Sequence, residues 1–268
     1  MQPLLDALRN RDIILFVGAG VSMNVDLPSW SKLVDEMATR VGYDPDIFSQ
    51  LGDHLTLAEY YVLQHKSLGK LRSWMDTEWH SEKKRKEVEE SEIHKMLVGL
   101  PCDIIYTTNY DRYLEWACEA QDRAYTKVTN VGDLVHIDDQ KLEIIKFHGD
   151  FDDDQSIVLT ESSYFERLSF ESPLDIKLRA DVLGKTILFL GYSLSDINMR
   201  LLFFKLHKLW ESSPYANARP NSYIFLTRPN PVQEAVLKSR GIEPIISPTD
   251  DPREGLKAFL ADLHSRLE

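Results

Sequence analysis

The sequence predicts an α/β protein built on a doubly wound, Rossmann-like parallel sheet. Short apolar runs alternate with amphipathic helical patterns along the chain, which is the order found when parallel strands are joined by helices. Some runs, such as Ile13–Val17, have no polar break, so these strands are expected to be buried on both faces. Many runs end in small or polar residues, as expected at the edge of a parallel sheet where ligands bind.

Helices are expected around the first strand. Apolar residues at helical spacing predict a lead-in helix over residues 1–10 and a second helix over residues 30–41. No good strand pattern occurs between residues 44 and 100, where helices are expected over 55–64 and 68–79. We therefore expect one domain over residues 1–268, with a helical insertion over approximately 44–100 that caps the ligand site.

Residues 81–92 form a dense run of charged side chains within this insertion. Such a run is typical of a solvated helix face that is held by pairs of opposite charge four residues apart. It is also a candidate contact with a partner protein.

The strand pattern returns in the second half of the chain. Strands are expected over residues 103–106, 142–147, 156–160, 186–190, 222–226 and 244–246. Helical patterns separate or follow them: one carries Leu114, Ala117 and Cys118, and others lie at 161–183 with a break near Pro173, at 199–210, at 232–239 and at 256–267.

Composition narrows the classes of function. The chain has 268 residues, 43% of them hydrophobic, and a net charge of −12, which argues against a direct nucleic-acid surface over most of the protein. Cys102 and Cys118 form no CxxC pair and are too few for a four-ligand zinc site. We therefore expect a cytoplasmic protein with reduced cysteines and without zinc. The sequence shows no signal-peptide pattern and no run of membrane-spanning length, so no membrane partner is expected.

Four of the expected strands end in turns that the topology would gather at one edge of the sheet. These turns are Gly18-Ala19-Gly20-Val21-Ser22, Thr107-Thr108-Asn109-Tyr110-Asp111, His148-Gly149-Asp150 and residues 191–196. Gly18 and Gly20 let the backbone turn sharply and approach a phosphate closely. By itself this first turn could be an ordinary strand-to-helix turn, because Met23 stands where a dinucleotide fingerprint requires a third glycine.

In order and spacing, these turns, with Phe147-His148-Gly149 and Gly191-Tyr192-Ser193, resemble the sirtuin family. The resemblance is closest to the zinc-less bacterial sirtuin-like NAD hydrolases of anti-phage defence, and it is weakest across residues 44–100. It implies NAD as the substrate, with Asn109 and His148 as catalytic residues that flank the nicotinamide ribose. It implies NAD binding by Gly18, Ala19, Gly20, Ser22, Thr108, Asp111, Gly191 and Ser193. Asp111 could instead order its own loop or cap the next helix.

Taken singly, these residues have simpler interpretations. A histidine at a strand end is often structural, and Asn109 could be a turn residue that tolerates positive φ. The other histidines match no motif and are expected at the surface or in packing: His54, His65, His80, His94, His136, His207 and His264. Residues 152–154 are three adjacent aspartates, which are more often solvated than metal-binding.

The region after His148-Gly149 departs from the pattern of deacetylating sirtuins, because it lacks the four zinc-binding cysteines that help to shape an acyl-lysine groove. The remaining chemistry is cleavage of the nicotinamide–ribose bond, with water giving nicotinamide and ADP-ribose. Asn109 would orient the water or the ribose hydroxyls, and His148 would accept a proton. The alternatives are an NAD-dependent protein deacylase or ADP-ribosyltransferase, and a non-catalytic module that senses NAD or ADP-ribose.

The resemblance also implies partners. It predicts a homo-oligomer, or association with a separate protein such as a helicase-type ATPase or an Argonaute-like protein.

Overall fold

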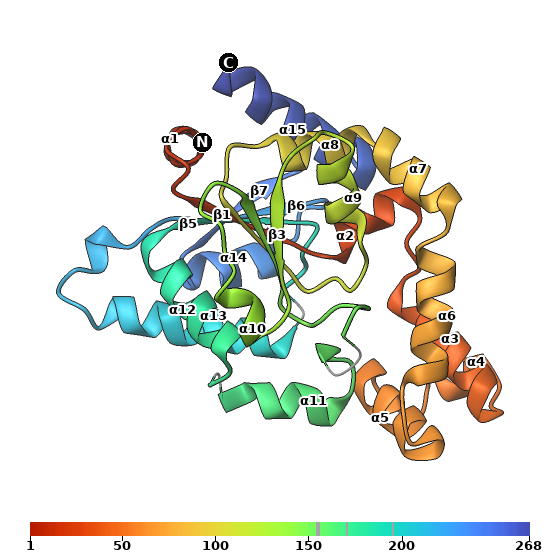
Figure 1. The fold of residues 1–268 in the computed structure, drawn as a ribbon. Coiled ribbons are helices and arrows are strands. Elements are labelled where there is room, and N and C mark those ends of the chain that lie inside the picture. Colours follow the sequence, from red (N-terminus) through yellow and green to blue (C-terminus); the bar gives the residue numbers. More distant parts are fainter. Residues whose placement is uncertain (154–155, 170, 195) are drawn as a thin grey trace.

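The computed structural model shows a seven-stranded parallel sheet with helices on both faces (Figure 1). The structure describes residues 1–153, 156–169, 171–194 and 196–268. The strands are β1 (Ile13–Val17), β2 (Ile104–Thr107), β3 (Tyr125–Val128), β4 (Leu142–Lys146), β5 (Thr186–Leu190), β6 (Ser222–Leu226) and β7 (Ile242–Ile246). Their order is β3-β4-β2-β1-β5-β6-β7. The chain fills one side of β1 first and then returns to fill the other, which confirms the doubly wound prediction.

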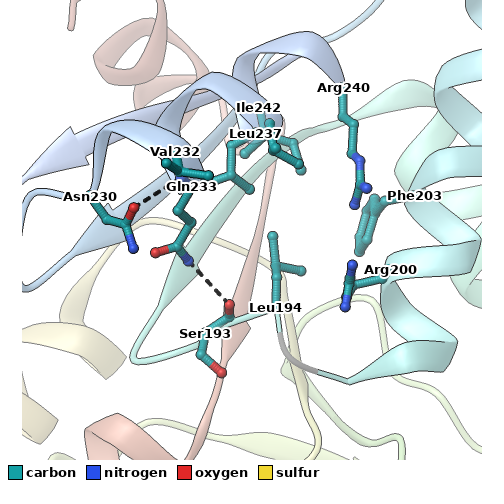
Figure 2. A pocket seen from close by; sticks show the side chains of 11 residues that line it. Ser193, Leu194, Arg200, Phe203, Asn230, Val232, Gln233, Leu237, Arg240 and Ile242 are labelled. Atoms are coloured by element: carbon teal, nitrogen blue, oxygen red, sulfur yellow. Dashed lines mark hydrogen bonds between the residues drawn. The ribbon is translucent and has the colours of Figure 1, made fainter.

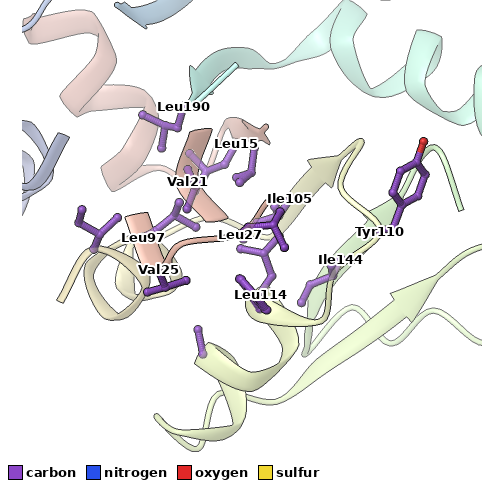
Figure 3. Close-up of a cluster of buried hydrophobic side chains, with 14 of the residues drawn as sticks. Leu15, Val21, Val25, Leu27, Leu97, Ile105, Tyr110, Leu114, Ile144 and Leu190 are labelled. Atoms are coloured by element: carbon purple, nitrogen blue, oxygen red, sulfur yellow. The ribbon is translucent and has the colours of Figure 1, made fainter. Parts of the chain in front are cut away.

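The apolar runs bury their side chains on both faces because each face carries a layer of helices. Ile14 and Phe16 of β1 belong to one buried cluster, together with apolar residues of α12 (Pro173–Gly184), α13 (Ile197–Glu211) and α14 (Pro231–Ser239). Leu15 and Val17 belong to the other cluster, part of which Figure 3 shows around Ile105 and Leu190. The helices of this second face include α1 (Gln2–Arg9), α3 (Trp30–Val41), α8 (Glu92–Gly99), α9 (Tyr113–Glu119) and α15 (Pro252–Leu267).

The expected helical segment lies at one side of the sheet (Figure 1). It contains α4 (Pro45–Phe48), α5 (His54–His65), α6 (Gly69–Trp79), α7 (Glu82–Glu90) and α8. The charged helix α7 buries only Val88. It carries ion pairs such as Arg85–Glu89 at 2.8 Å, as predicted for a solvated helix face. The remaining α-helices of the described residues are α2 (Ala19–Ser22), α10 (Val131–Leu134) and α11 (Glu161–Glu166).

Two strand assignments differ from the prediction. Residues 156–160 were expected to be a strand, but they run as an irregular segment in which Val158 N donates one hydrogen bond to His148 O at 2.9 Å. The apolar side chains that suggested a strand, Ile157 to Leu159, are buried beside the sheet rather than within it. Conversely, β3 was not predicted, because only Val128 of this edge strand is buried and no apolar run marks it.

Strand register places the four predicted turns at one level. Val17 pairs with Thr107 on one side and with Leu190 on the other, and Thr107 pairs with Lys146. The next residues are Gly18, Thr108, Gly191 and Phe147, so all four turns leave the sheet at the same edge. Among the described helices, none has an apolar stretch long enough to cross a membrane.

Candidate active site

A cavity of about 770 Å³ lies at this edge of the sheet, which is a typical size for a small-molecule site. The turns after the four central strands contribute Ala19, Gly20, Thr108, Asn109, Tyr110, Asp111, His148, Gly191, Tyr192, Ser193 and Asp196. The helices α3, α5, α6 and α11 contribute Trp30, Leu33, His54, Leu55, Trp79, Tyr164 and Phe165 among others. Eight of the ten predicted site residues therefore line one cavity, and Gly18 and Ser22 lie behind its wall.

The glycine turns pack backbone against backbone. Gly18 N donates to Leu190 O and Gly20 N donates to Gly191 O, each at 2.9 Å. Gly191 has a φ of +59°, and a Cβ atom there would lie 2.4 Å from Val21 N. Glycine is therefore required at position 191 by both conformation and space. Since the amides of Gly18 and Gly20 are already bonded within the protein, close approach rather than free amides is what these glycines offer a ligand.

Asn109 is held by a chain of buried hydrogen bonds. Its backbone N donates to Thr107 Oγ1 at 3.0 Å, and its Nδ2 donates to Ser22 Oγ at 3.1 Å. Ser22 Oγ in turn donates to Asp111 Oδ2 at 2.9 Å. The other oxygen of Asp111 accepts from Tyr113 N at 3.0 Å, so Asp111 orders its own loop and the start of α9, which was one of the two interpretations. Ser22 thus acts here as a link behind the cavity wall.

His148 is buried and has two polar neighbours. Its Nδ1 lies 3.4 Å from the Tyr164 hydroxyl, and its Nε2 lies 3.2 Å from Asp196 Oδ2. The second pair is close but not aligned for a hydrogen bond. Burial, with a smaller effect from the charge of Arg167, lowers the pKa of His148 to about 3. The imidazole is therefore neutral near pH 7 and can accept a hydrogen bond.

Asp196 is a further site residue, which the sequence pattern did not predict. One carboxylate oxygen caps α13 by accepting from Asn198 N at 2.8 Å and Met199 N at 3.1 Å, while the other faces His148. Burial raises the pKa of Asp196 above its ordinary value. An aspartate just before an amphipathic helix signals a cap, and only the fold reveals the second role.

The lining of this cavity has a one-sided charge. Among the described residues, the lining includes the carboxylates Asp53, Asp111, Glu161 and Asp196 but no lysine or arginine. Such a lining favours a ligand that carries or develops positive charge. It does not favour a ligand that is held by cationic side chains. His54 also lines the cavity, with its exposed ring 4.7 Å from that of Trp30, so this histidine borders the site although no motif marks it.

No metal centre is evident in the described ranges, where no three or more His, Cys, Asp or Glu side chains are placed to hold an ion. Cys102 and Cys118 are buried, and burial raises the pKa of Cys102 to about 11. Asp152 pairs with Lys127 and, at 2.9 Å, with Arg112, while Asp154 lies outside the described residues. That the protein works without zinc stays a prediction.

A second cavity of about 300 Å³ lies between α13 and α14 (Figure 2). Ser193 lines both cavities, and its carbonyl accepts a hydrogen bond from Gln233 Nε2 at 3.5 Å. Ser193 therefore marks the end of the main cavity that lies toward α14.

Comparison with known proteins agrees with this architecture. The family described as "SIR2-like domain" matches residues 103–245, more than half of the chain. The chain is 33% identical over 72% of its length to the "NAD(+) hydrolase ThsA" of Enterococcus faecium, and 30% identical over 74% to that of Bacillus cereus. It is 25% identical over 88% of its length to "Defense-associated sirtuin 2" of Bacillus subtilis.

The chain spans only 40% of the length of each of those two hydrolases and 23% of the third relative. Among solved structures, a complex of a Sir2 homologue with NAD shares the fold, with a TM-score of 0.54 at 13% identity; the match covers all of this chain and 95% of the other. From the matched residues and the shared fold, the chain belongs to the SIR2-like domain family.

Proposed function

We propose that this chain hydrolyses the nicotinamide–ribose bond of NAD, giving nicotinamide and ADP-ribose, as the effector of a bacterial anti-phage defence system. One observation carries the proposal: Asn109 and His148, from separate turns, line the same cavity at the edge of the sheet. The relatives, which are named as NAD(+) hydrolases and a defence-associated sirtuin, support it.

NAD would lie along the turns that line the cavity. The pyrophosphate would contact Ala19 and Gly20, with the closely packed Gly191 beside them, while Thr108 would contact the nicotinamide half. The adenosine ribose would reach Ser193 at the end toward α14. Ser22 and Asp111 would act through Asn109, because their hydrogen bonds fix its side chain.

The reaction needs little covalent help from the protein, because the nicotinamide of NAD is a cationic leaving group. As the glycosidic bond breaks, its electron pair returns to the pyridine nitrogen and positive charge develops on the ribose. The carboxylate of Asp196 would stabilise that charge. Asn109 would orient the attacking water, whose oxygen bonds to the anomeric carbon.

The proton of that water would pass to His148. No described protein group makes an aligned hydrogen bond to its Nε2, although Asp196 Oδ2 lies 3.2 Å away. A water or ribose hydroxyl placed between these two atoms would let the imidazole and the carboxylate share the proton.

The direct test is incubation of purified protein with NAD, with nicotinamide and ADP-ribose quantified by chromatography. A hydrolase gives the two products in equal amounts. A sensing module gives binding without either product. A deacylase or ADP-ribosyltransferase releases nicotinamide only when an acyl-lysine peptide or another acceptor is present.

The cellular setting is part of the proposal. We place the protein in the cytoplasm, where NAD is available. Since an unrestrained NAD hydrolase would drain its own cell, we propose restraint within a homo-oligomer or by a partner such as a helicase-type ATPase or an Argonaute-like protein.

A further inference from the structure

The last residue of β4 is a lysine with a completely buried side chain, two positions before His148. Lys146 has a side-chain exposure of 0%. A buried ammonium is costly unless charges and hydrogen bonds compensate it, so its partners indicate its role.

Those partners come from both turns that carry the proposed catalytic residues. Lys146 Nζ donates to the backbone carbonyls of Asp111 and, at 3.4 Å, of Tyr110, the two residues that follow Asn109. It also lies 3.2 Å from Asp150 Oδ2, two residues after His148. A fourth contact joins it to Glu115 Oε1 of α9, at 3.2 Å.

The ammonium keeps its charge in this position. Burial opposes the charged form, but the carboxylates of Glu115 and Asp150 outweigh that effect and raise the pKa of Lys146. The contacts are nevertheless incomplete. Among the described residues, none makes a hydrogen bond to Glu115 Oε2, and Asp150 Oδ2 is close to the ammonium without hydrogen-bond alignment. Buried ion clusters of this kind contribute little net stability compared with apolar packing.

We propose that Lys146 is a positioning residue that fixes the separation of Asn109 and His148 by binding the turn of one and the turn of the other through a single ammonium group. The expected change in kcat rests on the proposed NAD hydrolysis, whereas the expected change in the position of Asn109 does not. Thr107 and Lys146 are register partners on neighbouring strands, so the ammonium spans the two turns where they leave the sheet.

Lys127 offers a matched control. Its Nζ lies 3.2 Å from the same aspartate, Asp150, and it also pairs with Asp152. Its side chain is 25% exposed, and its ion pairs join it to Asp150 and Asp152 rather than to the Asn109 turn. Removing this lysine takes away a charge beside Asp150 and leaves the link between the two turns in place.

The experiment compares Lys146→Met, Lys127→Met and the double variant Lys146→Met/Glu115→Leu. The double variant removes the carboxylate that the single change leaves buried and unpaired, so it should recover much of the lost thermal stability. Each protein is assayed for kcat and KM with NAD. The side-chain amide NMR signal of Asn109 reports its position whether or not NAD is turned over.

We expect Lys146→Met to lower kcat about 100-fold, as a displacement of roughly 1 Å can, with KM within about threefold and a shifted Asn109 signal. The double variant keeps the low kcat and the shifted signal although it regains stability, and Lys127→Met stays within about threefold of the wild type in kcat.

Recovery of kcat together with stability in the double variant would reduce Lys146 to a structural residue and overturn the proposal. An unchanged kcat in Lys146→Met, an equal loss in Lys127→Met or failure of the double variant to fold would do the same. If the wild-type protein releases no nicotinamide, the proposed function fails on its own. The Asn109 signal then decides the positioning role: a shift in Lys146→Met supports it and an unchanged signal rejects it.

Discussion

Asn109 and His148 follow neighbouring strands but are held in different ways. Asn109 is anchored through Thr107 and Ser22, whereas His148 Nε2 is buried without an aligned hydrogen-bond partner. A buried polar atom in that state costs free energy until a partner arrives. In the proposed reaction, a substrate hydroxyl or water would bond to this nitrogen.

Replacement of either residue by alanine should remove activity and keep the fold. For Asn109→Ala and His148→Ala we expect nicotinamide release from NAD to fall about 100-fold to 10,000-fold. Asn130→Ala is the control, since Asn130 caps α10 outside the cavity. Near-normal release by either site variant, with circular dichroism unchanged, would remove that residue from the mechanism.

Among the elements, the turn after β5 has the strictest requirement on residue type. In Gly191→Ala, a Cβ atom 2.4 Å from Val21 N at a φ of +59° would push the two glycine turns apart. We expect a loss of about 1–3 kcal/mol in unfolding free energy and weaker NAD binding, measured by urea denaturation and calorimetry.

Gly184→Ala is the comparison, because beyond the adjacent residues and the backbone of its own helix no heavy atom lies within 4 Å of the added Cβ. That variant should be close to the wild type in stability and NAD binding. Equal effects in both glycine variants would contradict the close packing of the turns after β1 and β5.

Helix α8 carries a pH-sensitive contribution to stability. Burial lowers the pKa of His94 from 6.5 to about 4. Between these values the unfolded chain binds a proton that the folded protein excludes, so stability falls as pH drops from 6.5 towards 4. His94→Leu should flatten the pH dependence of unfolding free energy by up to about 1.4 kcal/mol per pH unit. Urea denaturation at pH 7, 6 and 5 measures it, and parallel slopes for the two proteins would contradict it.

At the scale of the whole molecule, unbroken apolar runs made much of the fold predictable. The strands Ile13–Val17, Thr186–Leu190 and Ser222–Leu226 have the predicted bounds, because each is buried at every position. The edge strand β3 lacks that signal, and residues 156–160 carry it without pairing as a strand. The local sequence pattern therefore indicates which residues are buried. Whether a segment pairs as a strand depends on its neighbours in the fold.

The position of the candidate site was also predictable from the strand pattern, but the contacts within the site were not. Asn109 and His148 follow strand patterns directly, so parallel topology brings them to one edge. The contact of Asp196 with His148 and the burial of Lys146 under both turns depend on distances between elements far apart in the sequence. No periodicity in the sequence encodes those distances.

The proposed restraint predicts a property of the assembled protein. We expect light scattering to show an oligomer, or a monomer whose NAD cleavage is low until a partner protein is added. The charged helix α7 and the helices before it are the proposed contact surface. A monomer with full activity by itself would contradict this prediction.

Whether NAD cleavage needs an acylated peptide is tested by measuring nicotinamide release from NAD with and without an acetyl-lysine peptide. The protein is assayed alone and with any activating partner, and Asn109→Ala serves as the blank. For an NAD hydrolase we predict that nicotinamide and ADP-ribose form together without peptide, and that peptide does not accelerate their release. Nicotinamide that appears only with peptide, in step with loss of the acetyl group, would show a deacylase and contradict the account.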